Sequence, residues 1–139
     1  MANLRVTGCH FVVPVDVYKK DVCFMFGYSR KEILRILKVY DDTKIREIRK
    51  HFKSFNGGYE GLCVIGKFGQ ILITMPVMPT TADHFDTLAH EIFHGVEGIM
   101  SNIGNEHRKD DVDESWAYLI GYLTGQAQMK LGEYYKFAL

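Results

Sequence analysis

The sequence contains two histidines four positions apart, His90 and His94, inside a segment whose apolar residues recur with helical spacing. Four of these apolar residues form one stripe when the segment is wound into a helix: Leu88, Ile92, Val96 and Ile99. Because residues i and i+4 lie on the same face of an α-helix, the two imidazoles are predicted to lie one turn apart. This segment constrains the fold most, since it must form a long amphipathic helix over about residues 82–101.

The residue that follows the first histidine gives this spacing a chemical meaning. Glu91 completes the pattern H-E-x-x-H over His90–His94. Two imidazoles on one helical face can hold one zinc ion at about 2.0–2.1 Å, and the glutamate can take a proton from a water that the zinc activates. The pattern therefore predicts Zn²⁺ as cofactor and Glu91 as a catalytic general base. The alternative is a core helix whose two histidines are merely hydrogen-bonded.

A catalytic zinc needs a third protein ligand and an open position for water. Glu114, which begins the pattern E-x-x-A on the last predicted helix, is the leading candidate. Small residues let two helices approach closely, so the face that carries them is expected to pack on the motif helix, which offers Gly95 and Gly98. The small residues of the last helix are Ala117, Gly121 and Gly125. Alternatives stay open: Glu97 as the ligand, as a partner of the histidines or as a plain surface charge, and Glu114 as part of a capping box with Asp111.

Other polar residues are candidates for supporting roles. Asp86 lies one turn before His90, where it could accept a hydrogen bond from that ring or be a plain surface charge. His107, in the loop between the last two helices, and Tyr118, on the last helix, could stabilise the oxyanion of a tetrahedral intermediate, as could Tyr122; the alternative for each is a structural role. The remaining histidines have no spacing relation to the motif: His10, His51 and His84.

The rest of the sequence predicts a single α+β domain over residues 1–139. Two strands are expected at Cys9–Val17 and Val22–Phe26, and a β-hairpin joins Leu62–Ile65 to Ile71–Thr74. Four helices are expected. The first starts at Ser29, which forms a capping box with Glu32, and the others span Thr43–Phe52, about Ala82 to Ser101 and about Val112 to Leu131. Thr80 or Thr81 is expected to cap the helix that begins at about Ala82. The basic residues of the Thr43–Phe52 helix are expected to form a solvated face.

Composition limits the partners and the compartment. The formal net charge is zero, with 17 basic and 17 acidic residues, so no nucleic acid and no membrane surface is expected as a partner through bulk electrostatics. Cys9, Cys23 and Cys63 form no C-x-x-C pair and are expected to be free thiols in a reducing compartment. The N-terminus lacks the pattern of a signal peptide, and no apolar run approaches the roughly 18 residues of a membrane span. A soluble cytoplasmic protein is expected; its oligomeric state is not indicated.

The stretch Thr87–His94, followed by Asp113–Tyr122, resembles the zincin metallopeptidases and, within them, the minimal gluzincins. It resembles more narrowly the small zincin-like proteins of bacteriophages and prophages. The resemblance covers about residues 70–125. It implies a small sheet or hairpin with packed helices, an active-site helix and a C-terminal glutamate helix, with zinc at His90, His94 and Glu114. The metzincin pattern is excluded because it needs a glycine and a histidine where Glu97 and Met100 stand.

The resemblance also implies a function. The chain would be a zinc-dependent peptidase acting on a peptide or protein, in the host cytoplasm if phage-encoded. An extended substrate would lie along an edge strand, expected at Ile71–Met75. Tyr118 stands where larger gluzincins have an aspartate, and only 25 residues follow Glu114, so the cleft is expected to be open on one side. The alternative function is that of a zincin-fold binding or regulatory protein, such as a phage factor acting on a host protein.

Overall fold

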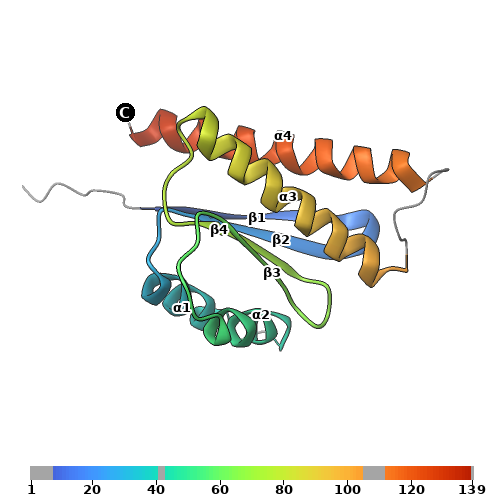
Figure 1. Cartoon of the computed structure of the whole chain (residues 1–139), viewed down its shortest axis with the longest axis horizontal. Coiled ribbons are helices and arrows are strands. Elements are labelled where there is room, and N and C mark those ends of the chain that lie inside the picture. The colour runs from blue at the N-terminus through green and yellow to red at the C-terminus, as the bar shows by residue number, and fades with distance from the viewer. Residues whose placement is uncertain (1–7, 41–42, 105–111, 139) are drawn as a thin grey trace, which may run out of the picture.

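The structure is a computed structural model that describes residues 8–40, 43–104 and 112–138. In this part of the chain a mixed four-stranded sheet lies between two pairs of helices, which confirms the α+β class (Figure 1). The strands are β1 (Cys9–Val15), β2 (Lys20–Phe26), β3 (Leu62–Ile65) and β4 (Ile71–Met75). The helices are the 3₁₀ turn η1 (Asp16–Tyr18), α1 (Arg30–Val39), α2 (Thr43–Ser54), α3 (Ala82–Asn102) and α4 (Val112–Ala138).

The order of strands in the sheet is β1-β2-β4-β3. The predicted hairpin is confirmed, since β3 and β4 are antiparallel with Leu62 opposite Thr74 and Ile65 opposite Ile71. The prediction that Ile71–Met75 is an edge strand is wrong, because β4 also pairs in parallel with β2. All of its residues are buried, as expected for a strand covered on both faces and both sides. The edge position beside β4 belongs to β3.

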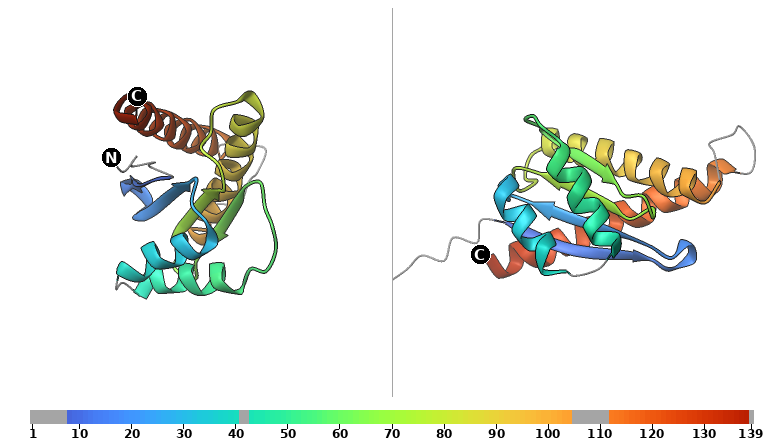
Figure 2. Two further views of the ribbon diagram at one scale, coloured as in Figure 1. Left: turned by 90° about the vertical axis from the view of Figure 1, so that its left-hand side faces the viewer. Right: turned by 90° about the horizontal axis from the view of Figure 1, so that it is seen from below.

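Side chains of the two central strands alternate between two cores. Phe24 and Ile73 point to the layer of α3 and α4, whereas Met25 and Leu72 point to the layer of α1 and α2. This alternation follows from the two-residue period of a strand. The two views of Figure 2 show the same arrangement, with one helical pair on each face of the sheet. The motif helix α3 is therefore fixed from below by a continuous apolar surface.

Local hydrogen bonds explain where two of the helices begin. The capping box of α1 is confirmed: the backbone N–H of Glu32 donates to Oγ of Ser29 at 3.2 Å, and the N–H of Ser29 donates to the Glu32 carboxylate at 3.0 Å. Helix α3 begins after Thr81, whose Oγ1 accepts from the N–H of His84 at 3.2 Å. The ring of His84 accepts in return from the N–H of Thr81, so this histidine is a capping residue.

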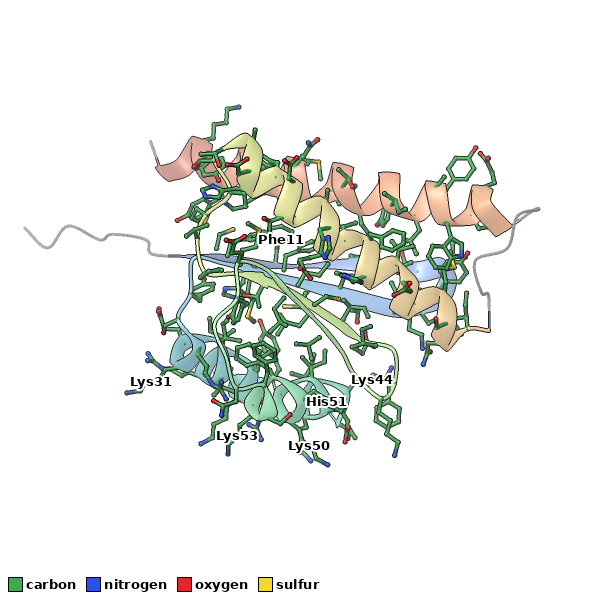
Figure 3. All side chains as sticks on the ribbon, in the orientation of Figure 1. Phe11, Lys31, Lys44, Lys50, His51 and Lys53 are labelled. Carbon is green, nitrogen blue, oxygen red and sulfur yellow. The ribbon has the colours of Figure 1, made fainter. Side chains whose placement is uncertain are left out.

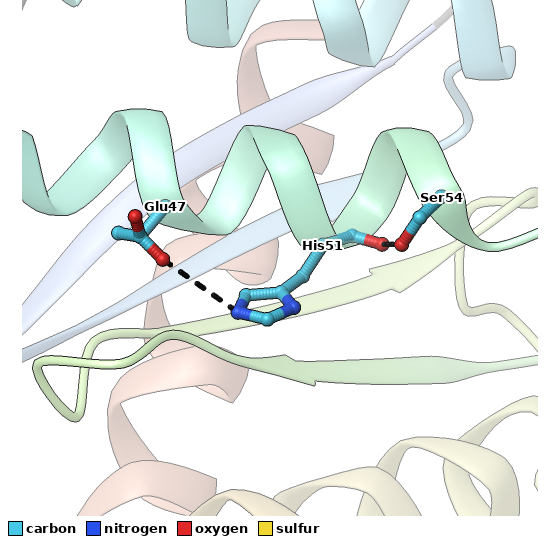
Figure 4. A network of polar contacts seen from close by, with 3 residues as sticks. All are labelled: Glu47, His51 and Ser54. Carbon is cyan, nitrogen blue, oxygen red and sulfur yellow. Dashed lines mark hydrogen bonds and ion pairs between the residues drawn. The ribbon is translucent and has the colours of Figure 1, made fainter.

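The layer of α1 and α2 presents a basic surface away from the sheet. Lys31, Lys50 and Lys53 are exposed and extend outward (Figure 3). His51 belongs to this surface: its Nε2 lies 3.7 Å from Oε2 of Glu47, and its carbonyl accepts a hydrogen bond from Ser54 Oγ at 2.8 Å (Figure 4). These contacts stay within one helix, so His51 is a surface residue on a different layer from the motif. None of the helices described here has the length and apolarity that a membrane crossing needs.

Candidate metal centre

His90 and His94 lie one turn apart on α3, as the sequence predicts. Their Nε2 atoms face each other at 3.0 Å. A tetrahedral zinc with Zn–N bonds of about 2.0–2.1 Å holds two such nitrogens roughly 3.3 Å apart, so a small rotation of the rings would fit the pair to the ion. In the absence of a metal, one Nε2–H donates a hydrogen bond to the other ring. The pair thus meets the geometric requirement for two ligands of one ion.

Glu97 lies beside the second histidine. Its Oε1 is 3.8 Å from Nδ1 of His94, the ring nitrogen that does not face His90. Metal-binding histidines usually donate this second N–H to a carboxylate or a carbonyl, which fixes the tautomer. Glu97 is therefore an exposed carboxylate beside His94, in the position of a partner of this ring or of a surface charge.

Glu91 is the one charged residue that is buried in the described part of the chain, with 7% of its surface exposed. It lies against the segment that enters β3: a Cβ added at Gly61 would be 2.9 Å from Glu91 Cγ. Burial raises the pKa of Glu91, and the neighbouring His90 and His94 partly oppose this. A raised pKa makes the carboxylate a better proton acceptor near neutral pH, as a general base requires.

His90 and Glu91 both line one cavity of about 490 Å³. One wall is the first half of α3, and the other is the segment before β3. The lining residues are Glu60, Gly61, Asp86, Thr87, His90 and Glu91. Asp86 is therefore an exposed carboxylate at the candidate site, and its hydrogen bond to the His90 ring stays a prediction. Glu60 and Gly61 were not identified from the sequence, because no spacing pattern connects a loop glycine and its neighbour to a motif some thirty residues away.

Close contact between α3 and the sheet depends on two glycines of the helix. A Cβ added at Gly98 would be 2.6 Å from Cδ1 of Ile65 in β3, and one added at Gly95 would be 3.3 Å from Cδ1 of Ile73 in β4. The sequence-based expectation that these glycines face α4 is therefore wrong. They let α3 lie low over the hairpin, so that Glu91 reaches the start of the edge strand.

The contact at Gly61 leads to a prediction. We expect Gly61→Ala to lower the free energy of unfolding by about 1–3 kcal/mol, because the new Cβ would lie 2.6 Å from Thr87 Cγ2. Gly58→Ala is the matched control in the same loop, with nothing within 4 Å of the added carbon, and should change stability by less than about 0.5 kcal/mol. Urea denaturation measures both. Equal effects of the two substitutions would contradict the close approach.

The structure does not bring Glu114 together with the histidine pair. No group of three or more His, Cys, Asp or Glu side chains suited to a metal ion exists within residues 8–40, 43–104 and 112–138. The reason is the rotation of α4, which buries its bulky residues and leaves Glu114 exposed. The buried residues of this helix are Trp116, Leu119, Leu123, Ala127 and Leu131.

The predicted packing of the small-residue face of α4 on α3 is therefore wrong. At about 100° per residue, Gly121 and Gly125 lie opposite the buried stripe, on the same side as Glu114. A Cβ added at either glycine would have nothing within 4 Å. The start of α4 is nevertheless close to the motif, since the rings of Phe93 and Trp116 have centroids 6.1 Å apart. Two of the three predicted zinc ligands are thus assembled, and the third is two positions from a residue that contacts the motif helix.

The candidates for oxyanion stabilisation gain no support. Tyr118 is 73% exposed and lines a separate cavity of about 420 Å³ together with η1 and the end of β1. Tyr122 donates a hydrogen bond from its hydroxyl to the carbonyl of Pro14 at 2.8 Å. Neither tyrosine lines the cavity of His90 and Glu91. His107 and Asp111 lie outside the described residues.

Comparison of the chain with models of protein families, with curated proteins and with solved structures gives no match. The functional interpretation therefore depends on the geometry of the motif and its cavity.

Proposed function

We propose that this chain is a zinc-dependent peptidase of the minimal gluzincin type. The observation that carries the proposal is the H-E-x-x-H turn itself: two imidazoles with Nε2 atoms 3.0 Å apart, and beside them a buried carboxylate that opens onto a cavity. Burying a carboxylate costs free energy unless it is paired, so Glu91 is a poor choice for a purely structural residue. Its position has a clear use as an acid–base group.

In this proposal His90 and His94 hold the zinc, and Glu97 orients His94. When bound there, the metal supplies Lewis acidity, which makes water a competent nucleophile near neutral pH and polarises a substrate carbonyl. Glu91 accepts the proton from the attacking water and then delivers it to the leaving amine nitrogen. Glu114 remains the proposed third ligand. Because the described residues do not already assemble three donors, this carboxylate has to change position to join the histidines.

The position of β3 supports a peptide as the substrate. This strand pairs with β4 on one side only in the described sheet, and it begins directly after Gly61, which contacts Glu91. An edge strand can bind an extended peptide through its outer backbone groups. A peptide added along β3 would therefore pass close to the general base.

Zinc analysis of the purified chain tests the metal centre. After zinc loading and desalting, we expect one equivalent per chain, lost in His94→Ala and retained in His51→Ala, the control on the opposite layer. Glu114→Gln should weaken zinc binding by more than about tenfold, since even the loss of an outer partner of a ligand typically costs 10–100-fold. Zinc content that is unaffected by His94→Ala would refute the site.

A second candidate function is that of a zincin-fold binding or regulatory protein. The observation that favours it is the exposed Glu114, which leaves the described donors short of a complete catalytic ligand set. The two functions are separated by Glu91→Gln. Chelator-sensitive cleavage of a protein substrate that disappears in this variant supports the peptidase, whereas stoichiometric inhibition of a partner that persists supports the binding protein.

A further inference from the structure

The cavity beside His90 is lined by three carboxylates from two different parts of the chain. Asp86 and Glu91 belong to α3, and Glu60 comes from the segment before β3. Asp86 and Glu60 are exposed at the mouth, whereas Glu91 lies deeper, with 7% of its surface accessible. The cavity therefore has one buried and two solvent-facing acidic groups around a common space.

The segments that line the cavity contain no lysine or arginine. The sequence has no Lys or Arg at positions 54–66 or 68–107, a range that includes the whole of α3 and the segment before β3. Lys67 lies in the turn at the far end of β3. The basic residues of α1 and α2 lie on the other face of the sheet (Figure 3). A recess lined by one sign of charge concentrates ligands of the opposite sign.

The buried carboxylate is an independent indication of a ligand. Within the described residues, burial raises the pKa of Glu91 and the charges of His90 and His94 lower it, with no hydrogen bond among the causes, and the side chain lines the cavity. A carboxylate that is more than nine-tenths buried and lines an open cavity is placed to receive a donor from outside the chain.

We infer that this cavity binds the cationic side chain of a lysine or arginine, and that the substrates are peptides carrying such a residue beside the cleaved bond. The inference deepens the proposed peptidase function and rests on it. Glu60 and Asp86 hold the ammonium or guanidinium group at the mouth, and the alkyl part of the side chain lies along Thr87. Because both carboxylates are exposed, each contributes a preference of about 2- to 5-fold, which shrinks as salt increases.

The test is a binding measurement on the full-length, metal-free protein. Three fluorescent peptides that differ at one position, with lysine, norleucine or glutamate, are titrated at low and high salt. We expect the lysine peptide to bind most tightly, with an advantage over norleucine that falls severalfold in Glu60→Gln, in Asp86→Asn and at high salt. Glu133→Gln, a carboxylate removed from α4, is the control and should leave the advantage unchanged.

The outcomes distinguish failure of the cationic site from failure of the peptidase function. Equal affinity for the lysine and norleucine peptides overturns the inference, as does a divalent-ion site that Glu60→Gln abolishes without any lysine preference. Cleavage of peptides without preference for a basic residue would leave the peptidase intact and remove the cationic specificity. A lysine preference in binding, with no cleavage after zinc loading, would retain the cationic site and remove the peptidase.

Discussion

Replacement of Glu91 by glutamine is expected to abolish peptide hydrolysis while zinc binding is retained. The amide has nearly the same shape as the carboxylate but cannot accept the proton of the attacking water, and general-base catalysis typically contributes about 10²–10⁴-fold to the rate. Chelator-sensitive cleavage of a protein substrate, measured together with zinc content, tests this. Glu133→Gln on α4 is the matched control and should cleave at the wild-type rate. Full activity in Glu91→Gln would remove this residue from the mechanism.

The same variant carries a stability signature that shows whether it folds. Burial raises the pKa of Glu91 above its ordinary value of 4.5, so the folded state binds this proton more tightly than the unfolded state does. The contribution of Glu91 to the free energy of unfolding is therefore fully present below pH 4.5, and it is lost as the pH rises through the pKa of Glu91 in the folded state. In metal-free protein, Glu91→Gln should therefore be more stable than wild type at pH 7, and the gap should close toward pH 4.5. A gap that is independent of pH in urea denaturation would contradict this.

Phe24→Ala is expected to cause the largest loss of stability. Phe24 is fully buried on the central strand β2, and its ring centroid lies 5.2 Å from that of Phe11 and 6.0 Å from that of Phe26. Truncation of such a ring removes apolar contact and leaves a cavity, at a cost of about 3–5 kcal/mol.

Phe68, which is 41% exposed in the β3–β4 turn, provides the comparison. Phe68→Ala should change the free energy of unfolding by less than about 1 kcal/mol, because its side chain leaves little void behind. Denaturant titration of both variants measures the difference. Similar losses for the two phenylalanines would mean that the core on the α3–α4 side is not packed as described.

Most elements could be predicted from the sequence because their determinants are local. The Ser29–Glu32 capping box and the hairpin turn each depend on residues within a few positions of one another. The position of β4 in the sheet could not be obtained in this way. It depends on parallel pairing with β2, which α1, α2 and β3 separate from it along the chain. The run Ile71–Met75, which is apolar except at Thr74, is nevertheless typical of an interior strand.

In the candidate site, too, some positions have local determinants and others depend on long-range packing. His90, Glu91 and His94 depend only on helical spacing within one turn. The position of Glu114 depends on the rotation of α4 about its axis, and the sequence offers two faces of that helix for packing against the core. The face with Trp116 and three leucines buries far more apolar surface than the glycine face, at about 25 cal/mol per Å², and therefore faces the core.

The low position of α3 over the hairpin has a consequence for how such a chain could lose the proposed activity. The short distance between Glu91 and the strand that begins after Gly61 depends on Gly95 and Gly98, which have no side chain to hold α3 away from the sheet and belong to no ligand pattern. A larger residue at position 98 would lift the helix and carry Glu91, the proposed proton acceptor, away from a peptide lying along β3. Such a variant would retain His90, Glu91 and His94 yet lose the proposed activity, so the H-E-x-x-H pattern alone would be an insufficient criterion for an active peptidase.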